Sequence, residues 1–204
     1  MPHPLVEAGA RANLCFHDIT DTPDNIYGLP MDYLLAVLDG LRAEGIADRV
    51  RVYFDDGYAS VTAVVARLQQ AYPEVELVLA LTLDFLDKPG FIGAAEVPTL
   101  HQAGAMISAH GREHLHMAQL ADDQILTQLR ASHEAFDRYG SREFVLPYGS
   151  YDERLLEINE RHRLYDFIAT VDYGWDRGQL LRPRLIATSE ITPAGVISRL
   201  AQPA

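Results

Sequence analysis

Apolar runs of strand length alternate along the whole chain with longer segments of helical periodicity. The strand-length runs lie at 13–18, 50–54, 75–82, 105–109, 143–146, 167–171 and 184–188. The helical segments lie at 31–44, 58–72, 92–102, 122–139, 152–163 and 192–200. This alternation predicts a parallel sheet covered by helices. About seven parallel strands are fewer than the eight of a full (β/α) barrel, so we expect an incomplete or distorted (β/α) barrel. The length of 204 residues fits one domain, and we expect residues 1–204 to form a single α/β domain.

The charge balance limits the partners of the protein. The 204 residues include 17 basic and 29 acidic side chains, which give a formal net charge of −12. A surface of this charge repels nucleic-acid backbones and anionic lipid headgroups, so we expect no nucleic-acid partner. A neutral or cationic sugar polymer is compatible with such a surface. The oligomeric state is left open by the sequence.

Three features bear on the cellular compartment. Residues 1–13 lack the apolar core of a signal peptide, so we expect a cytoplasmic protein, with a removed leader as the alternative. The chain contains no uninterrupted apolar span long enough to cross a bilayer. Cys15 is the sole cysteine, which excludes an internal disulfide, and its apolar neighbours predict a buried, unreactive thiol.

Two adjacent carboxylates follow the second apolar run. Asp55, Asp56 and Gly57 come directly after the run 50–54, so a strand there would deliver both acids to its C-terminal end. In α/β folds, ligands collect at that edge of the sheet. Adjacent carboxylates repel each other, and a divalent metal ion is a partner that relieves the repulsion. Taken alone, the motif also fits an ordinary acidic turn.

Two further motifs follow strand-length runs. His110 and His114 come after the run 105–109, and their four-residue spacing puts both imidazoles on one side of a helical turn or tight loop, as a shared metal ion requires. The alternative is a pair of histidines at the start of a helix. Pro147-Tyr148-Gly149 follows the run 143–146 and predicts a rigid turn.

The three motifs in this order resemble those of the metal-dependent polysaccharide deacetylases, the family with the NodB homology domain (carbohydrate esterase family 4). That family carries Thr/Ser-Phe-Asp-Asp-Gly, then His-x-x-x-His, then Arg-x-Pro-Tyr/Phe-Gly. This chain carries Tyr53-Phe54-Asp55-Asp56-Gly57, His110-x-x-x-His114 and Val145-Leu146-Pro147-Tyr148-Gly149. The resemblance implies a (β/α) barrel of the deacetylase type over most of the chain.

The resemblance also implies roles for single residues. Asp56, His110 and His114 would hold one divalent metal ion, for which zinc is expected and other divalent metals remain open. Asp55 would act as the catalytic base, because a carboxylate bound to a metal is a poor base. The backbone N–H of Tyr148 would help to bind the oxyanion.

Two residues are assigned to substrate binding on weaker grounds. Pro147 belongs to the turn that carries Tyr148, for which a simple turn is the alternative. Trp175 is the only tryptophan, and family members carry an aromatic residue near this point that can stack on a sugar ring. Packing in the core is the alternative for Trp175.

The chain departs from the family pattern in two places. Val145 stands where the family has an arginine that pairs with the catalytic base, so its effect on activity is open, and Arg182 or Arg184 are alternative sources of the charge, with Arg184 as the assigned partner. No histidine lies in or beyond the last strand, where many members carry the general acid. His17, after the first run, resembles instead the acid histidine of the circularly permuted branch that includes poly-N-acetylglucosamine deacetylases. Closure of the barrel would bring the first and last strands together, and a structural histidine is the alternative.

These inferences predict a hydrolase that removes N-acetyl groups from an amino-sugar polysaccharide or oligosaccharide. One alternative is the same chemistry on a small cytoplasmic substrate, such as a nucleotide-linked or lipid-linked sugar. A second alternative is a catalytically inactive carbohydrate-binding or regulatory protein, which the loss of arginine at Val145 suggests. The sequence leaves open the identity and length of the sugar.

Overall fold

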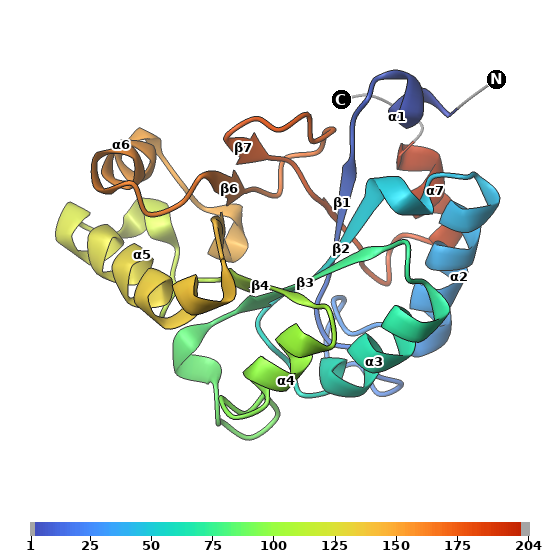
Figure 1. Ribbon diagram of the computed structural model, residues 1–204, viewed down its shortest axis with the longest axis horizontal. Coiled ribbons are helices and arrows are strands. Elements are labelled where there is room, and N and C mark those ends of the chain that lie inside the picture. The colour runs from blue at the N-terminus through green and yellow to red at the C-terminus, as the bar shows by residue number, and fades with distance from the viewer. Residues whose placement is uncertain (1–2, 201–204) are drawn as a thin grey trace.

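Eight parallel strands form one sheet within residues 3–200, the part of the chain that the computed structural model describes (Figure 1). Their order across the sheet is β7-β6-β5-β4-β3-β2-β1-β8, and each pair of neighbours is parallel. The strands are β1 (Ala12–Phe16), β2 (Val50–Phe54), β3 (Glu76–Leu81), β4 (Met106–Ala109), β5 (Glu143–Val145), β6 (Phe167–Ala169), β7 (Leu181–Arg182) and β8 (Leu185–Ile186). The parallel sheet expected from the sequence is confirmed.

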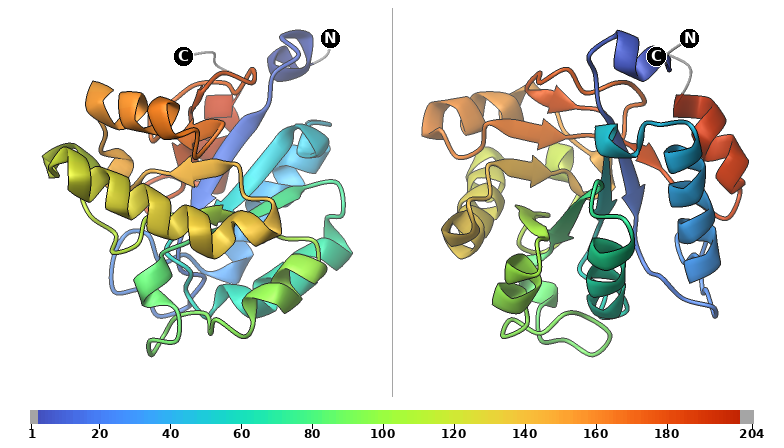
Figure 2. Two further views of the ribbon diagram at one scale, coloured as in Figure 1. Left: turned by 60° about the vertical axis from the view of Figure 1, so that its left-hand side comes forward. Right: turned by 45° about the vertical axis from the view of Figure 1, so that its right-hand side comes forward.

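Helices connect most of the strands and cover the outer face of the curled sheet (Figures 1 and 2). The α-helices are α1 (Pro4–Glu7), α2 (Met31–Ala43), α3 (Val61–Ala71), α4 (Val97–Gln102), α5 (Asp122–Phe136), α6 (Glu153–His162) and α7 (Pro193–Leu200). Short 3-10 helices are η1 (Ala47–Arg49), η2 (Leu83–Phe85), η3 (Met117–Gln119), η4 (Asp137–Tyr139) and η5 (Pro147–Gly149). The long helices bury one apolar side each, and α2 packs against α7 while α5 packs against α6. The result is one α/β domain, an incomplete (β/α) barrel.

One extended segment closes this barrel. β7 and β8 are separated only by Pro183 and Arg184, yet β7 pairs with β6 at one edge of the sheet and β8 pairs with β1 at the other. The first and last strands are therefore neighbours, as the permuted arrangement requires. The sequence pattern predicts a single last strand from 184 to 188, whereas the structure has two short strands, β7 and β8. The pattern misses β7 because two residues are too few to show a periodicity.

Side-chain alternation separates the barrel interior from the helix-covered core. Leu14 and Phe16 of β1 pack in the large core under the helices, whereas Cys15 lies in a small buried cluster made only of strand residues. Cys15 and Tyr53 are register partners, and both belong to this interior cluster. Because successive side chains point to opposite faces, the residues two positions further on, His17 and Asp55, are directed toward the C-terminal mouth of the barrel.

The segment 92–102, expected to be helical throughout, is helical only from Val97. Pro98 in the first turn suits a helix start at this point. The residues before it form a loop in which Ile92 N–H donates to the carbonyl of Gly57 at 2.8 Å. This bond anchors the turn that follows Asp55 and Asp56.

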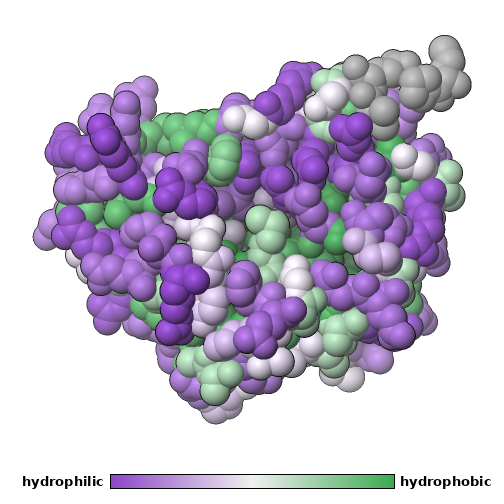
Figure 3. All heavy atoms as spheres, in the orientation of Figure 1, coloured by the Kyte–Doolittle hydropathy of each residue, from purple (hydrophilic) through white to green (hydrophobic). Residues whose placement is uncertain are grey.

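The face of the molecule seen in Figure 3 is mainly polar. Hydrophilic side chains cover most of the face seen in Figure 3, with smaller hydrophobic areas between them. Among the helices of residues 3–200, none combines the length and the hydrophobicity that a membrane crossing requires.

Candidate active site

A pocket of about 390 Å³ opens at the C-terminal ends of the strands. Its polar lining consists of His17, Asp55, Asp56, His110, His114 and Arg184. Its other walls are Tyr27, Leu146, Tyr148, Val171 and Ile186. Three separate parts of the chain thus bring both carboxylates and all three expected histidines to one place.

Asp56, His110 and His114 converge on one point. Asp56 Oδ1 lies 3.3 Å from His110 Nε2 and 3.0 Å from His114 Nε2. Asp56 and His114 both have left-handed backbones, with φ of 70° and 58°, which turn their side chains toward His110. Such strained backbones persist where the surrounding structure requires them.

The hydrogen bonds of this trio favour a cation at its centre. His110 Nδ1 lies 2.9 Å from the carbonyl of Val145, which can only accept, so Nδ1 carries the proton and Nε2 presents a lone pair. Within residues 3–200, Asp56 Oδ1 is among the buried oxygens that have no hydrogen-bond donor. Two imidazoles and one carboxylate form a donor set used by catalytic zinc, so the residues present fit a divalent metal ion.

Asp55 faces a different partner. Arg184 Nη1 lies 2.8 Å and 2.9 Å from its two carboxylate oxygens, and both side chains are almost fully buried. Burial alone raises the pKa of the Asp55 carboxyl, but the positive charge of Arg184, the largest opposing effect, brings that pKa below its usual value. Val145 directs its side chain into the barrel interior, so the guanidinium beside Asp55 comes from the closing segment instead.

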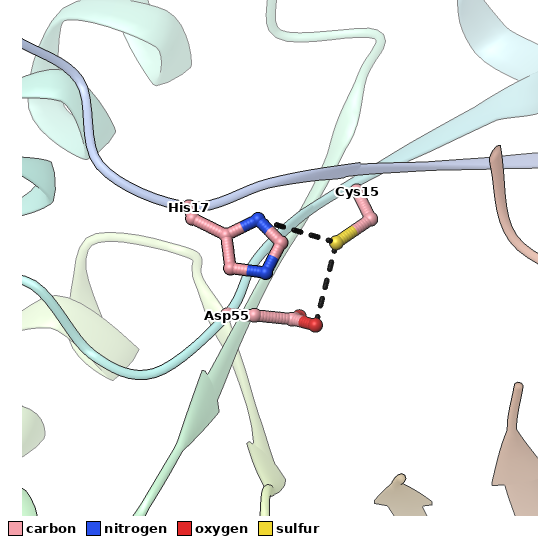
Figure 4. Close-up of side chains that lie close together, drawn as sticks. All are labelled: Cys15, His17 and Asp55. Carbon is pink, nitrogen blue, oxygen red and sulfur yellow. Dashed lines mark hydrogen bonds between the residues drawn. The ribbon is translucent and has the colours of Figure 1, made fainter. Parts of the chain in front are cut away.

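His17 lies just beyond the end of β1. Its ring packs on Tyr27 with the centroids 4.8 Å apart, and its Nδ1 lies 3.9 Å from Cys15 Sγ (Figure 4). Burial lowers the pKa of His17, although the Asp55 and Asp56 charges oppose this effect. At neutral pH the imidazole is therefore mainly uncharged in the free protein.

Tyr148 follows β5 in the turn η5. Its backbone is left-handed, with φ 58° and ψ 8°, and the residue is 57% exposed. The ring stacks on His116 at a centroid distance of 3.9 Å and meets His114 edge-on at 4.5 Å. Gly149 is required next to it, because its φ is +64° and an added Cβ would lie 2.2 Å from Val171 Cγ2.

The two residues assigned to substrate binding do not line this pocket. Trp175 is buried in the large core, and the backbone of its neighbour Asp176 bonds to that of Arg11, which precedes β1. Trp175 therefore lies toward the opposite, N-terminal end of the barrel, and the structure supports the packing alternative. Pro147 is buried beneath Gly111, where it shapes the turn of Tyr148 instead of facing the pocket.

Several pocket residues carry no motif. Leu146, Val171 and Ile186 belong to expected strands, so only their position near the ends of these strands could have indicated that they line the pocket. Tyr27 lies in a loop and has no signal of its own in the sequence. Cys15, which lies behind Asp55 and His17, is buried as its apolar neighbours predict.

The chain matches the family model described as polysaccharide deacetylase over residues 43–165, a range that includes both carboxylates, His110, His114 and Tyr148 but not His17 or Arg184. No protein among the curated sequences matches.

Solved structures share the fold. The deacetylase PplD of Streptococcus pyogenes in complex with acetate has a TM-score of 0.81 at 16% identity, over 94% of this chain and 98% of that one. IcaB of Ammonifex degensii has a TM-score of 0.79 at 15% identity, over 95% and 97%. A polysaccharide deacetylase of Bacillus cereus has a TM-score of 0.80 at 16% identity, over 94% and 69%. Because the family model covers more than half of the chain and all three motifs, the protein belongs to the polysaccharide deacetylase family.

Proposed function

We propose that the protein is a metal-dependent hydrolase that removes N-acetyl groups from an amino-sugar polysaccharide or oligosaccharide. The observation that carries the proposal is the convergence of Asp56, His110 and His114 beside the separately held carboxylate of Asp55. Membership of the polysaccharide deacetylase family agrees with it.

Asp56, His110 and His114 would hold the divalent metal ion. The nitrogen and oxygen donors favour zinc among the biological divalent ions, with other transition metals open. When bound, such an ion supplies Lewis-acid polarisation of a carbonyl and lowers the pKa of water. The carbonyl of Val145 keeps the His110 ring in the tautomer that ligation needs.

Asp55 would accept a proton from the attacking water. It is suited to this task because Arg184 keeps it ionised and fixes both of its oxygens. A base must be charged and correctly oriented before the substrate arrives. The arginine that is absent at Val145 is thus replaced from the closing segment, which removes the main reason for regarding the protein as inactive.

His17 and Tyr148 would serve the other end of the reaction. His17 would give a proton to the leaving nitrogen, and a pKa lowered by burial makes the protonated imidazole a stronger acid. The Tyr148 backbone N–H would donate to the developing oxyanion. Leu146, Val171 and Ile186 form an apolar wall that suits the methyl of an acetyl group.

The direct test is acetate release from a panel of substrates. Metal-stripped and zinc-reconstituted protein are incubated with N-acetylated oligosaccharides of increasing length and with N-acetylated sugar nucleotides, and Asp55→Asn is the matched inactive control. We expect zinc-dependent acetate release from oligosaccharides. Release from sugar nucleotides alone would indicate a small cytoplasmic substrate, and no release from any substrate would contradict the proposal.

A further inference from the structure

Cys15 lies directly behind the pocket, close to two side chains that line it, His17 and Asp55. Cys15 Sγ lies 3.3 Å from Asp55 Oδ2 and 3.9 Å from His17 Nδ1, and Figure 4 shows the sulfur linked to both groups. Cys15 and His17 are two residues apart and share one side of the chain as it leaves β1, while Asp55 directly follows β2 beside it. The proposed hydrolysis uses Asp55 and His17 but gives Cys15 no part.

The spacing of these atoms suits a metal ion. Zinc binds sulfur at about 2.3 Å and nitrogen or oxygen at about 2.0–2.2 Å, so two ligand atoms of a tetrahedral site lie roughly 3–4 Å apart. The separations of 3.3 Å and 3.9 Å fall in this range, and all three ligand atoms lie within 4.8 Å of one another. Thiolate and imidazole together favour soft or borderline ions over magnesium and calcium.

We propose that Cys15, His17 and Asp55 form a second, inhibitory metal site that binds a thiophilic divalent ion, Zn²⁺ in excess or Cd²⁺. On binding, the thiol proton of Cys15 is released to solvent and its sulfur bonds to the ion. The inhibition rests on the proposed function, because the ion would occupy the carboxylate and the imidazole that this function assigns to proton transfer. Binding at the site does not depend on it.

Charge makes this site the weaker of the two. Arg184 lies within hydrogen-bond distance of both Asp55 oxygens, and its positive charge opposes a second cation there. In the other trio, Asp56 lies close to His110 and His114, and within residues 3–200 it forms no ion pair with an arginine. The second site is therefore expected to fill only when the first is occupied and the ion is in excess. Asp55 and His17 line the pocket, which provides a path for entry.

The binding test uses the full chain and CdCl₂. Metal-stripped protein is titrated while the ultraviolet charge-transfer band of a cadmium thiolate is recorded, and Cys15 is the sole cysteine, so any such band reports on this side chain alone. We expect the band to appear with the second equivalent and equilibrium dialysis to find two ions per chain. Cys15→Ser, which nearly preserves the volume, should bind one ion and show no band.

Two further arms locate the site and measure its effect. His17→Ala should weaken the band-forming affinity roughly tenfold or more, since losing even an outer partner of a ligand costs 10–100-fold. In the activity arm, zinc-loaded protein is assayed at rising ZnCl₂, and each variant is compared with its own rate at one equivalent. The unmodified protein should be inhibited and recover when a chelator removes the excess, whereas Cys15→Ser should resist.

The outcomes separate the two proposals. No thiolate band at saturating Cd²⁺, or two bound ions in Cys15→Ser, would overturn the second site. A band without zinc inhibition would overturn its inhibitory role. If no substrate is deacetylated, the proposed function fails, while the band and the stoichiometry still decide whether the site exists.

Discussion

Asp55 and Asp56 are neighbours in the chain, but their side chains have different partners. Asp55 continues the alternation of β2 and reaches Arg184, whereas the left-handed backbone of Asp56 turns its carboxylate toward His110 and His114. One residue therefore stays in an arginine pair while the next faces two imidazole nitrogens. This difference in partners is the physical basis for assigning one acid to proton transfer and the other to metal binding.

Substitution of the two acids should separate these roles. Asp55→Asn should leave zinc content nearly unchanged and lower kcat by about 10²–10⁴, the usual contribution of a general base. Asp56→Asn should instead lower the zinc affinity, because it removes a charged ligand. Zinc content by atomic absorption and kcat by acetate release are measured on both variants. Equal loss of zinc in the two variants would show that the assignment is wrong.

The role of His17 as the proton donor can be tested by substitution. His17→Ala should keep the zinc content and lower kcat by roughly 10²–10⁴, because the leaving amine would lose its proton donor. His162→Ala, at the exposed end of α6, is the matched control and should behave like the unmodified protein. Full activity of His17→Ala would leave this histidine with a structural role only.

The spacing of residues in the sequence could predict the part of the site that lies within one local turn. His110 and His114 lie in one local turn, so their four-residue spacing already restricts their geometry. The contact between Arg184 and Asp55 spans the whole chain and depends on barrel closure, so the sequence could offer Arg184 only as one of two alternatives. Trp175 has no local constraint, and its chemistry alone could not indicate at which end of the barrel it lies.

At the scale of elements, the turn η5 links β5 to the pocket. Pro147 is buried and fixes the start of the turn, Tyr148 adopts a left-handed backbone, and Gly149 passes close to Val171. The close approach leaves no space for a side chain at Gly149. The turn thus holds the Tyr148 N–H in one orientation by steric means.

Gly149→Ala tests this rigidity against Gly140→Ala. Both glycines have positive φ, so each substitution carries a backbone cost of roughly 1–2 kcal/mol. In Gly149→Ala alone, the added methyl group would also clash with the β-branched side chain of Val171. This overpacking should lower the unfolding free energy by a further amount of about 1–3 kcal/mol. We expect the larger loss of unfolding free energy in denaturant titrations, together with lower kcat, for Gly149→Ala. Equal losses in the two variants would mean that Val171 moves aside easily.

Element boundaries differ from the sequence pattern where tertiary contacts decide them. Residues 92–96 carry helical periodicity, but Ile92 bonds to the Gly57 carbonyl and the helix α4 starts later. The closing segment divides into β7 and β8 because it leaves one edge of the sheet and joins the other. Both contacts join segments that are distant in the sequence, so local periodicity does not reveal them. The long helices were predictable because their apolar periodicity is local, whereas these boundaries were not.

At the scale of the whole molecule, ion pairs connect different strands at both ends of the barrel. At the N-terminal end a chain of alternating charges joins several strands, in the order Arg11, Glu76, Arg51, Asp176, Arg182 and Glu143. At the C-terminal end, Arg184 joins the closing segment to Asp55 after β2 and also donates to the Thr170 carbonyl after β6. Barrel closure and the site therefore depend on the same arginine.

Arg184→Met should reverse the effect of pH on stability. In the metal-free protein the pKa of Asp55 lies below its ordinary value of 3.8, so its stabilising contribution is fully present above that pH and is lost only as pH falls through the lowered pKa. Without Arg184, burial becomes dominant and raises the pKa of Asp55. A raised pKa stabilises the folded state at low pH, and that stability is lost as pH rises through it.

The difference in unfolding free energy between the unmodified protein and Arg184→Met should therefore grow from about pH 4 to about pH 7. It should approach about 3–5 kcal/mol, the cost of leaving one member of a buried ion pair alone. Urea unfolding of metal-stripped protein across this range measures the difference. The double variant Asp55→Asn/Arg184→Met has neither charge, so its difference from the unmodified protein should stay constant with pH. A constant difference for Arg184→Met itself would show that Asp55 does not depend on Arg184 to remain ionised, and the guanidinium would then serve barrel closure alone.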